Sequence, residues 1–434
     1  MISPVKNMKN WLLTASLLTV PLISPAWEFR GEVALEGRYF TQDSPYPQAD
    51  YSTNGSGYIK PEVFHEWNNR DDLFTFIPYV RVDEHDSERT HWDIRELSWI
   101  HVGNGWESRV GIRKVFWGVT EGRHLVDIIN QTDQVDQVDG EEKLGQPMIN
   151  LSTVRDWGIV DVFVLPGFRE RTYAGEEGRP RTPLPVSDNA QYESSKENQR
   201  VDFAIRYQQY FDNGLELALS HFSGTSRDPL LVPDSLTLAE LQALIASGQL
   251  PSGSDPEFTP LYNVIDQTGL ELQYLNSGWL WKLEAISRSG QGERFNAVDG
   301  GFEFTQVGLF DTATDLGWIV EYIWEDREDS LASPLASDVL LGTRFTFNDV
   351  ASTEILAGII YDTQDEEKAI SLESSRRFGN SLKASLEARF YTDTGKPQSA
   401  SALYRDVLRN VNSNPGLGPI SRSDFVQAEL VYYF

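Results

Sequence analysis

The chain ends in the sequence Val426-Gln427-Ala428-Glu429-Leu430-Val431-Tyr432-Tyr433-Phe434, in which apolar side chains occupy every second position up to the last residue. Gln427, Glu429 and Tyr433 stand between them. Successive side chains of a β-strand point to opposite faces, so this spacing predicts a strand with one apolar and one polar face. Such a strand suits either a water-soluble sandwich or the wall of a membrane barrel.

The same alternation recurs along most of the chain in segments of about ten residues, the length of a membrane-spanning strand. In the first segment, Phe29, Val33 and Leu35 alternate with polar residues. The pattern predicts about eighteen strands, with sixteen as the alternative. We place them near residues 28–40, 58–67, 72–83, 91–102, 105–116, 148–155, 157–165, 199–211, 214–223, 263–275, 279–288, 299–309, 316–325, 338–347, 351–361, 367–378, 380–391 and 424–434.

The links between these strands alternate in length. Tight turns are predicted at residues 68–71, 103–105, 212–214, 276–278 and 378–380, most of them built from Asn, Asp and Gly. The other links are mostly long, at residues 41–57, 117–147, 166–198, 224–262, 289–298 and 392–423, with shorter ones at 84–90 and 362–366. Strict alternation places all tight turns at one rim and all long loops at the other. We therefore predict a closed antiparallel transmembrane β-barrel with short periplasmic turns and long extracellular loops.

Composition excludes several other classes of protein. The chain contains no cysteine, which excludes disulfide scaffolds and thiolate metal sites. Its formal net charge of −28 argues against a nucleic-acid partner, because phosphate backbones favour a basic surface. It has no apolar run of the length, about 18 residues or more, that a membrane-spanning helix requires.

The amino terminus has the features of an export signal. Lys6 and Lys9 precede an apolar stretch from Trp11 to Ile23, and small residues follow up to Ala26. We predict a cleaved signal peptide over residues 1–26 and a barrel domain over residues 27–434. A short amino-terminal membrane anchor is the alternative.

The carboxyl-terminal strand, with its final aromatic residue, resembles that of Gram-negative outer-membrane barrels. In strand count and loop layout, residues 27–434 look most like the larger porin-type channels, including alginate-export-like barrels. The resemblance implies integration in outer-membrane lipid and recognition of Tyr432 and Phe434 by the barrel-assembly machinery. The segment from Trp117 to Asp133 is distantly similar to the first long loop of porin-like families.

If the apolar face meets lipid, the polar face lines a lumen. The residues expected to line it are Arg30, Arg38, Arg81, Asp83, Arg109, Arg113, Asp202, Arg206, Glu284, Arg344, Glu387 and Arg389. Arginines on the first, third and fifth predicted strands would favour carboxylate or phosphate solutes. The alternative is that acids and bases on neighbouring strands neutralise one another as cross-strand pairs.

The predicted loop at residues 117–147 is longer than rim closure requires. Its apolar centre, residues 125–129, would be poorly placed in water, so we expect it to pack on the inner wall of the barrel. Asp127, Asp133 and Asp136 would then face the arginines of the first, third and fifth strands and form a constriction that favours zwitterions or polar solutes. An external flap is the alternative. The acidic residues of this loop miss the EF-hand spacing, which leaves only a looser loop-bound calcium site open.

Two helices are expected within the long loops, one after the capping box Thr237–Glu240 and one over residues 401–411. No metal ligand set, no cofactor motif and no catalytic motif is present, so we predict a channel for small polar or charged solutes rather than an enzyme. The alternatives are a surface, export or assembly barrel that acts through extracellular loops or periplasmic partners, and a barrel hydrolase using His85 or His91.

Overall fold

A computed structural model describes residues 27–327, 336–397, 399–409 and 416–434. The signal peptide expected over residues 1–26 lies outside the described residues.

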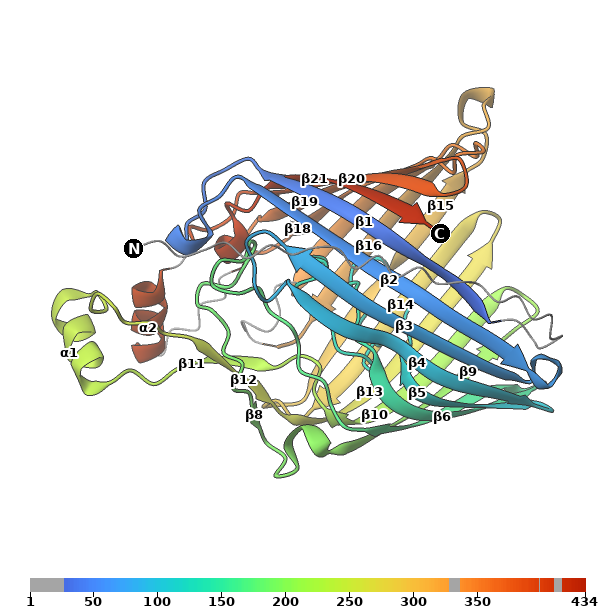
Figure 1. Cartoon of the computed structure of the whole chain (residues 1–434), viewed down its shortest axis with the longest axis horizontal. Helices are drawn as coiled ribbons and strands as arrows, with labels where there is room; N and C mark the ends of the chain where they lie inside the picture. The colour runs from blue at the N-terminus through green and yellow to red at the C-terminus, as the bar shows by residue number, and fades with distance from the viewer. Residues whose placement is uncertain (1–26, 328–335, 398, 410–415) are drawn as a thin grey trace, which may run out of the picture.

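Eighteen long strands form one closed antiparallel sheet, and the predicted barrel is confirmed (Figure 1). Each strand pairs with its neighbours in the chain order of the barrel, and β1 closes the sheet by pairing with β21. Closure leaves no unpaired sheet edge. The strands are β1 (Glu28–Phe40), β2 (Thr53–Trp67), β3 (Asp72–Asp83), β4 (His91–Gly103), β5 (Trp106–Arg113), β6 (Gln146–Arg155), β7 (Gly158–Pro166), β9 (Val201–Tyr210), β10 (Leu215–Thr225), β13 (Val264–Asn276), β14 (Trp279–Ser289), β15 (Phe295–Gln306), β16 (Asp315–Glu325), β17 (Ser337–Thr346), β18 (Glu354–Asp362), β19 (Lys368–Phe378), β20 (Leu382–Thr392) and β21 (Phe425–Tyr433).

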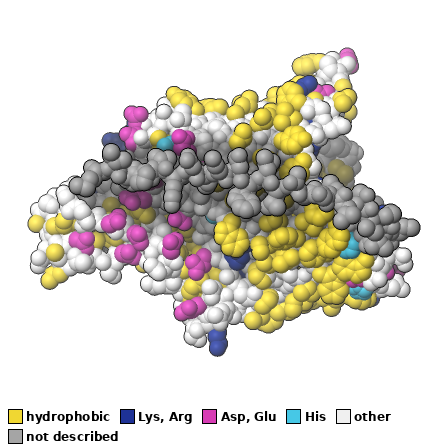
Figure 2. All heavy atoms as spheres, in the orientation of Figure 1, with side chains coloured by type: hydrophobic (Ala, Val, Ile, Leu, Met, Phe, Trp, Pro, Cys, Tyr) yellow, Lys and Arg dark blue, Asp and Glu magenta, His cyan; other side chains and the backbone are white. Residues whose placement is uncertain are grey.

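The two faces of the strands have the chemistry that the alternation predicts. Along β1, Glu36 and Arg38 point inward and are buried, whereas Leu35 is 68% exposed on the outside. Figure 2 shows hydrophobic side chains gathered over the part of the molecule that the barrel strands form, at the right of the view. Acidic side chains gather over the part that carries the long loops, at the left. The barrel therefore has an apolar outer surface and a charged interior.

The longest connections all lie at one end of the barrel, and the shortest lie at the other (Figure 1). One end, which we call the tight-turn end, carries short links such as residues 104–105, 156–157 and 277–278. Residue 434 also lies at this end. The other end, the long-loop end, carries the links 41–52, 84–90, 114–145, 167–200, 226–263, 290–294, 363–367 and 393–424. Gly105 and Gly278 adopt positive φ in the tight turns, a conformation that glycine reaches without steric cost.

A small folded unit, which we call the mouth cap, is built from three of the long loops (Figure 1). It contains a three-stranded sheet of β8 (Gln191–Tyr192), β11 (Leu230–Pro233) and β12 (Phe258–Tyr262), with helices α1 (Leu238–Ser247) and α2 (Ala400–Leu408). Leu184, Leu244, Phe258, Leu403 and Tyr404 form its apolar core. Both helices were predicted, α1 with its capping box, but the small sheet was not.

Five short 3₁₀ turns complete the secondary structure of the described residues: η1 (Pro47–Ala49), η2 (Asn68–Arg70), η3 (Glu197–Gln199), η4 (Leu309–Asp311) and η5 (Gly418–Ile420). None of the described helices has both the length and the apolar character needed to cross a membrane.

Candidate functional site

The connection between β5 and β6, residues 114–145, folds into the barrel, and we call it the inward loop. Its apolar centre, Leu125, Val126, Ile128 and Ile129, is buried together with inward side chains of the barrel wall. The wall side of this cluster comprises Met148, Phe163, Leu165, Ala204, Phe222, Ile265, Ile286, Phe295 and Ala297, from β6, β7, β9, β10 and β13–β15. The inward loop is thus held against one half of the wall by hydrophobic burial.

Three wall carboxylates on adjacent strands also hold the backbone of the inward loop. Glu284 accepts hydrogen bonds from the N–H groups of Val119 at 2.6 Å and Thr120 at 3.0 Å. Asp299 accepts from Arg123, and Glu321 from Glu121 and Gly122. Buried backbone donors need such partners, since an unpaired one costs free energy comparable to a lost hydrogen bond. The three carboxylates therefore fix the path of residues 119–123.

Glycine is required where this backbone approaches the wall. At Gly118, φ is +138° and a Cβ atom would lie 2.8 Å from a carboxylate oxygen of Glu284. A side chain at Gly122 would lie 2.9 Å from Ile323. Both positions exclude larger residues unless the wall moves.

The side of the inward loop that faces away from its packed apolar centre borders an open cavity of about 600 Å³, which we call the lumen cavity. Its other walls come from β1–β4 and β17–β21. Charged groups of both signs line it: Glu36, Arg38, Lys60, Arg81, Arg95, Asp136, Asp139, Glu142, Arg344, Glu354, Glu373, Lys383, Glu387 and Glu429. The open part of the barrel is therefore lined by mixed charge and lies beside the inward loop.

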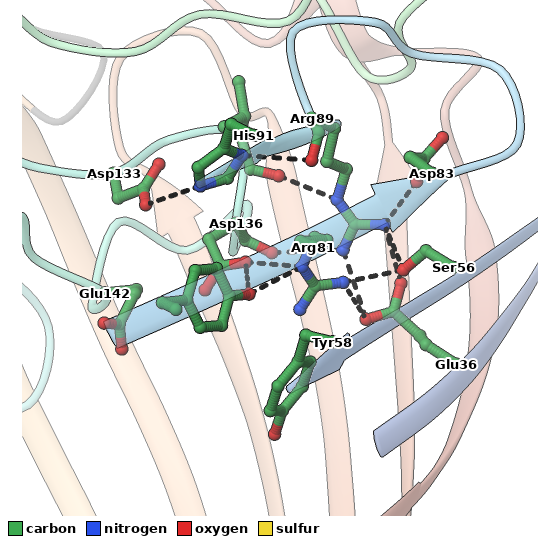
Figure 3. Close-up of polar contacts among 12 residues, drawn as sticks. Glu36, Ser56, Tyr58, Arg81, Asp83, Arg89, His91, Asp133, Asp136 and Glu142 are labelled. Atoms are coloured by element: carbon green, nitrogen blue, oxygen red, sulfur yellow. Dashed lines mark hydrogen bonds and ion pairs between the residues drawn. The ribbon is translucent and has the colours of Figure 1, made fainter. Parts of the chain in front are cut away.

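Asp136 connects the inward loop to Arg81 of β3 (Figure 3) and to Arg95 of β4. Its carboxylate lies 2.6 Å from Nε of Arg81 and 3.3 Å from Nη2 of Arg95. Arg81 also contacts Glu36 of β1 at 3.2 Å. Because these groups are buried, their charges interact more strongly than in water.

Asp133, three residues earlier in the inward loop, has a different set of partners. It lies 2.6 Å from Nη1 of Arg95 and 3.7 Å from His91. Burial raises the pKa of the Asp133 carboxyl, but the hydrogen bond from His91 and the charge of Arg95 outweigh burial and hold that pKa well below its usual range. Asp133 is therefore ionised over the whole physiological range of pH.

Asp127 does not face the arginines of the first, third and fifth strands. Its nearest cation is Lys143 of the same loop, at 3.4 Å, and it accepts the N–H of Trp117. Burial raises the pKa of Asp127 to about 6, and Lys143 offsets only part of this effect. Of the three aspartates, Asp136 contacts Arg81 of the third strand as expected, whereas Asp133 contacts Arg95 of the fourth strand instead.

The remaining sequence-predicted lumen residues all lie on inward positions and mostly form ion pairs. Arg206 pairs with Glu271 at 2.6 Å, Arg344 with Glu121 at 3.2 Å, and Arg389 with Glu387 at 2.8 Å. The other pairs are Arg30–Glu62 at the tight-turn end, Arg38–Glu36, Asp83–Arg89, Arg109–Asp161, Arg113–Glu96 and Asp202–Arg227. Glu284 instead binds the inward-loop backbone.

Arg95, the largest fully buried side chain of the site, is not among the lumen residues predicted from the sequence. The pairing of β3 with β4 shifts between Ile77 and Pro78, so that Ile77 faces Glu96 and Pro78 faces Ile94. Arg95 is the extra residue of this irregularity, which breaks the alternation that would have placed it. The signal available was Asp93 and Arg95 at every second position beside Trp92.

The two histidines considered for catalysis have other contacts. His85 stacks on Tyr51 with ring centroids 3.9 Å apart, and His91 lies against Asp133 and the carbonyl oxygen of Arg89. Within the described residues, no group of three or more His, Asp or Glu side chains is arranged to hold a metal ion.

Comparison with known proteins gives a structural similarity of low identity. No protein-family model and no curated protein sequence matches the chain. Among solved structures, one titled for the asymmetric conductivity of engineered proteins has 12% identity and a TM-score of 0.41, with 94% of this chain and 100% of the other covered. A triple mutant of the Rhodopseudomonas blastica porin has 11% identity and a TM-score of 0.40 over the same shares of both chains.

The chain is a closed antiparallel barrel of 18 strands with a charged interior. The comparisons identify no particular family within this architecture.

Proposed function

We propose that the protein is an outer-membrane channel that passes small polar or charged solutes. The observation that carries the proposal is the lumen cavity: a charged space inside a closed barrel, narrowed on one side by the inward loop. An open aqueous passage allows such charges to stay solvated and to act on passing ions.

The outer surface supports placement in a membrane. Trp279, Trp281, Trp318, Tyr322 and Trp324 are exposed on outward positions near strand ends, where an aromatic girdle meets the lipid–water boundary. In this placement the tight-turn end is periplasmic and the long-loop end extracellular. Residues 1–26 direct export, and Tyr432 and Phe434 are the signal for the barrel-assembly machinery.

The constriction formed by the inward loop suggests the class of solute. Asp139 of the loop lines the lumen cavity together with Arg344 and Lys383 of the wall, so a passing solute meets charges of both signs. Such mixed charge favours zwitterions and polar solutes over apolar ones. No resident cofactor is required.

The test is the conductance of the purified, folded protein in a planar lipid bilayer in KCl. We expect discrete, lasting current steps, because a hydrated lumen conducts ions. A folded barrel that inserts without current contradicts the proposal.

A second function is favoured by the mouth cap, which has its own apolar core. Loops that only connect neighbouring strands do not need an apolar core of their own. The mouth cap is therefore suited to binding partners at the cell surface, or to export or assembly with partner proteins. The same conductance experiment separates the two functions. A surface or assembly barrel gives no current and keeps its partner binding when its lumen is blocked.

A further inference from the structure

A second cavity, of about 200 Å³, lies at the long-loop end, and we call it the mouth pocket. Its wall combines the 167–200 link, the cap strands β11 and β12, and the last long link. Apolar and aromatic side chains dominate this wall, among them Tyr173, Pro183, Phe258 and Ile420. No Asp or Glu is among its described lining residues, although the chain as a whole carries a net charge of −28.

One cation, Arg181, lines the mouth pocket. The residue is 8% exposed, and its guanidinium stacks on Tyr46 with its Cζ atom 4.3 Å from the ring centroid. Among the residues that the structure describes, Nε and Nη1 of Arg181 have no hydrogen-bond partner, and Arg181 forms no ion pair. Burial lowers the pKa of Arg181, and the charge of Glu176 offsets only part of this effect.

Two other buried arginines have partners for more of their guanidinium nitrogens. Arg179 donates to the backbone carbonyl groups of Gln42 and Tyr51. Arg227, which is also buried, pairs with Asp202 at 3.2 Å. A buried charge with few partners is unfavourable, so the guanidinium of Arg181 gains from an anion bound in the mouth pocket.

The mouth pocket adjoins the route into the barrel. Val138 of the inward loop lines the mouth pocket, the lumen cavity and a third cavity of about 300 Å³ beside the wall. Gln134 lines both the mouth pocket and the third cavity. A solute in the mouth pocket therefore lies against the same loop that narrows the lumen.

We propose that the mouth pocket binds a small monocarboxylate with an apolar or aromatic body. The carboxylate would accept hydrogen bonds from Arg181, whose planar guanidinium matches its geometry, and the body would lie against Tyr173, Phe258 and Ile420. The cavity is smaller than sites for drug-sized ligands, and a single cation suits a singly charged anion. This inference rests on the proposed channel function and names the solute class captured at its mouth.

Benzoate, its neutral analogue benzamide and inorganic phosphate are suitable probes for calorimetric binding to the purified full-length protein in detergent micelles. We expect benzoate to bind about tenfold or more tightly than benzamide, because a charge-assisted hydrogen bond contributes at least this factor. Arg181→Gln should reduce benzoate binding to the benzamide level. Arg294→Gln is the matched control, because Arg294 lies in the 290–294 link at the same end and bonds only to Ser287 and Ser289 among the described residues.

A second variant, Ile420→Trp, fills the cavity and leaves Arg181 in place, and it should also abolish benzoate binding. Equal binding of benzoate and benzamide, or unchanged benzoate binding in Arg181→Gln, would overturn the inference. Phosphate binding as tight as that of benzoate and dependent on Arg181 would overturn the carboxylate assignment.

The micelle measurement does not depend on ion conduction, so the two proposals can fail separately. KCl conductance without benzoate binding refutes the mouth pocket alone. Benzoate binding that depends on Arg181, in a folded barrel that carries no current, supports the pocket and refutes the channel.

Discussion

Asp136 compensates the charges of two buried arginines at the edge of the lumen cavity. Asp136→Asn removes the negative charge and leaves Arg81 with Glu36, and Arg95 with Asp133. The lumen should then become more favourable to anions, and the chloride-to-potassium permeability ratio should rise on the order of twofold. Reversal potentials in a KCl gradient measure this ratio.

Glu66→Gln provides the control for this experiment. Glu66 pairs with Arg70 near the tight-turn end and does not line the lumen cavity. The same loss of one negative charge should leave the permeability ratio unchanged there. An equal shift in both variants would show that net charge, rather than the position of Asp136, sets selectivity.

Asp127 makes the stability of the fold depend on pH in the opposite sense to an ordinary ion-paired carboxyl. Its pKa is raised from 3.8 to about 6, so the folded state binds more protons than the unfolded state between these values. Its contribution to stability is fully present below pH 4 and is lost as the pH rises to about 6, a change of about 3 kcal/mol at most.

Asp127→Asn isolates this effect, because asparagine can still accept the N–H of Trp117. The stability difference between the variant and the natural chain should move in favour of the variant between pH 4 and pH 7. Urea unfolding in detergent micelles at the two pH values measures it. A difference that does not change with pH would show that Asp127 is solvated.

At the scale of elements, the inward loop separates into an anchored part and a tip. Thr132 and Lys143 pair as a bridge, so residues 134–141 form the tip that borders the lumen cavity. Replacing residues 135–141 with two glycines should raise the single-channel conductance roughly in proportion to the widened cross-section, while residues 125–129 stay packed on the wall. Shortening the 307–314 link at the tight-turn end is the control and should leave the conductance unchanged.

The final strand carries a second prediction. Phe434 is 52% exposed on the outer face, and its backbone N–H and C=O groups are both hydrogen-bonded to Gly31 of β1. Phe434→Asp should lower the amount of barrel in the outer membrane severalfold without altering the conductance of barrels that form. Phe378→Asp is the matched control, because Phe378 is 53% exposed at the same end but not terminal. Normal abundance of Phe434→Asp would contradict the assembly role.

Sequence periodicity predicted the long elements because each long strand repeats its alternation several times. The cap strands β8 and β11 contain two and four residues, too few to show a period. The burial of residues 125–129 could be predicted because apolar side chains in a long loop are unfavourable in water and must pack against another apolar surface. The partner of Asp127 could not, since Lys143 approaches it only through the bridge between Thr132 and Lys143.

At the scale of the whole molecule, both described ends of the chain lie at the tight-turn end, since β1 begins there and β21 ends there. The long-loop end carries the mouth cap and the mouth pocket. If both proposals hold, solute capture occurs at the long-loop end and passage follows the lumen cavity toward the tight-turn end. This direction of passage corresponds to uptake only if the long-loop end faces the outside of the cell.

Protease added to intact cells tests this orientation. We expect cleavage within residues 226–263, which form a long exposed link containing α1, and protection of residues 68–71 and 211–214, which are turns at the opposite end. After the outer membrane is permeabilised, the protected turns should remain slower to cut, because tight turns fit poorly into a protease cleft. A protease site inserted at residue 213 removes this difference in intrinsic rate. Cleavage at that site in intact cells, with residues 226–263 spared, would place the tight-turn end outside and reverse the proposed direction of uptake.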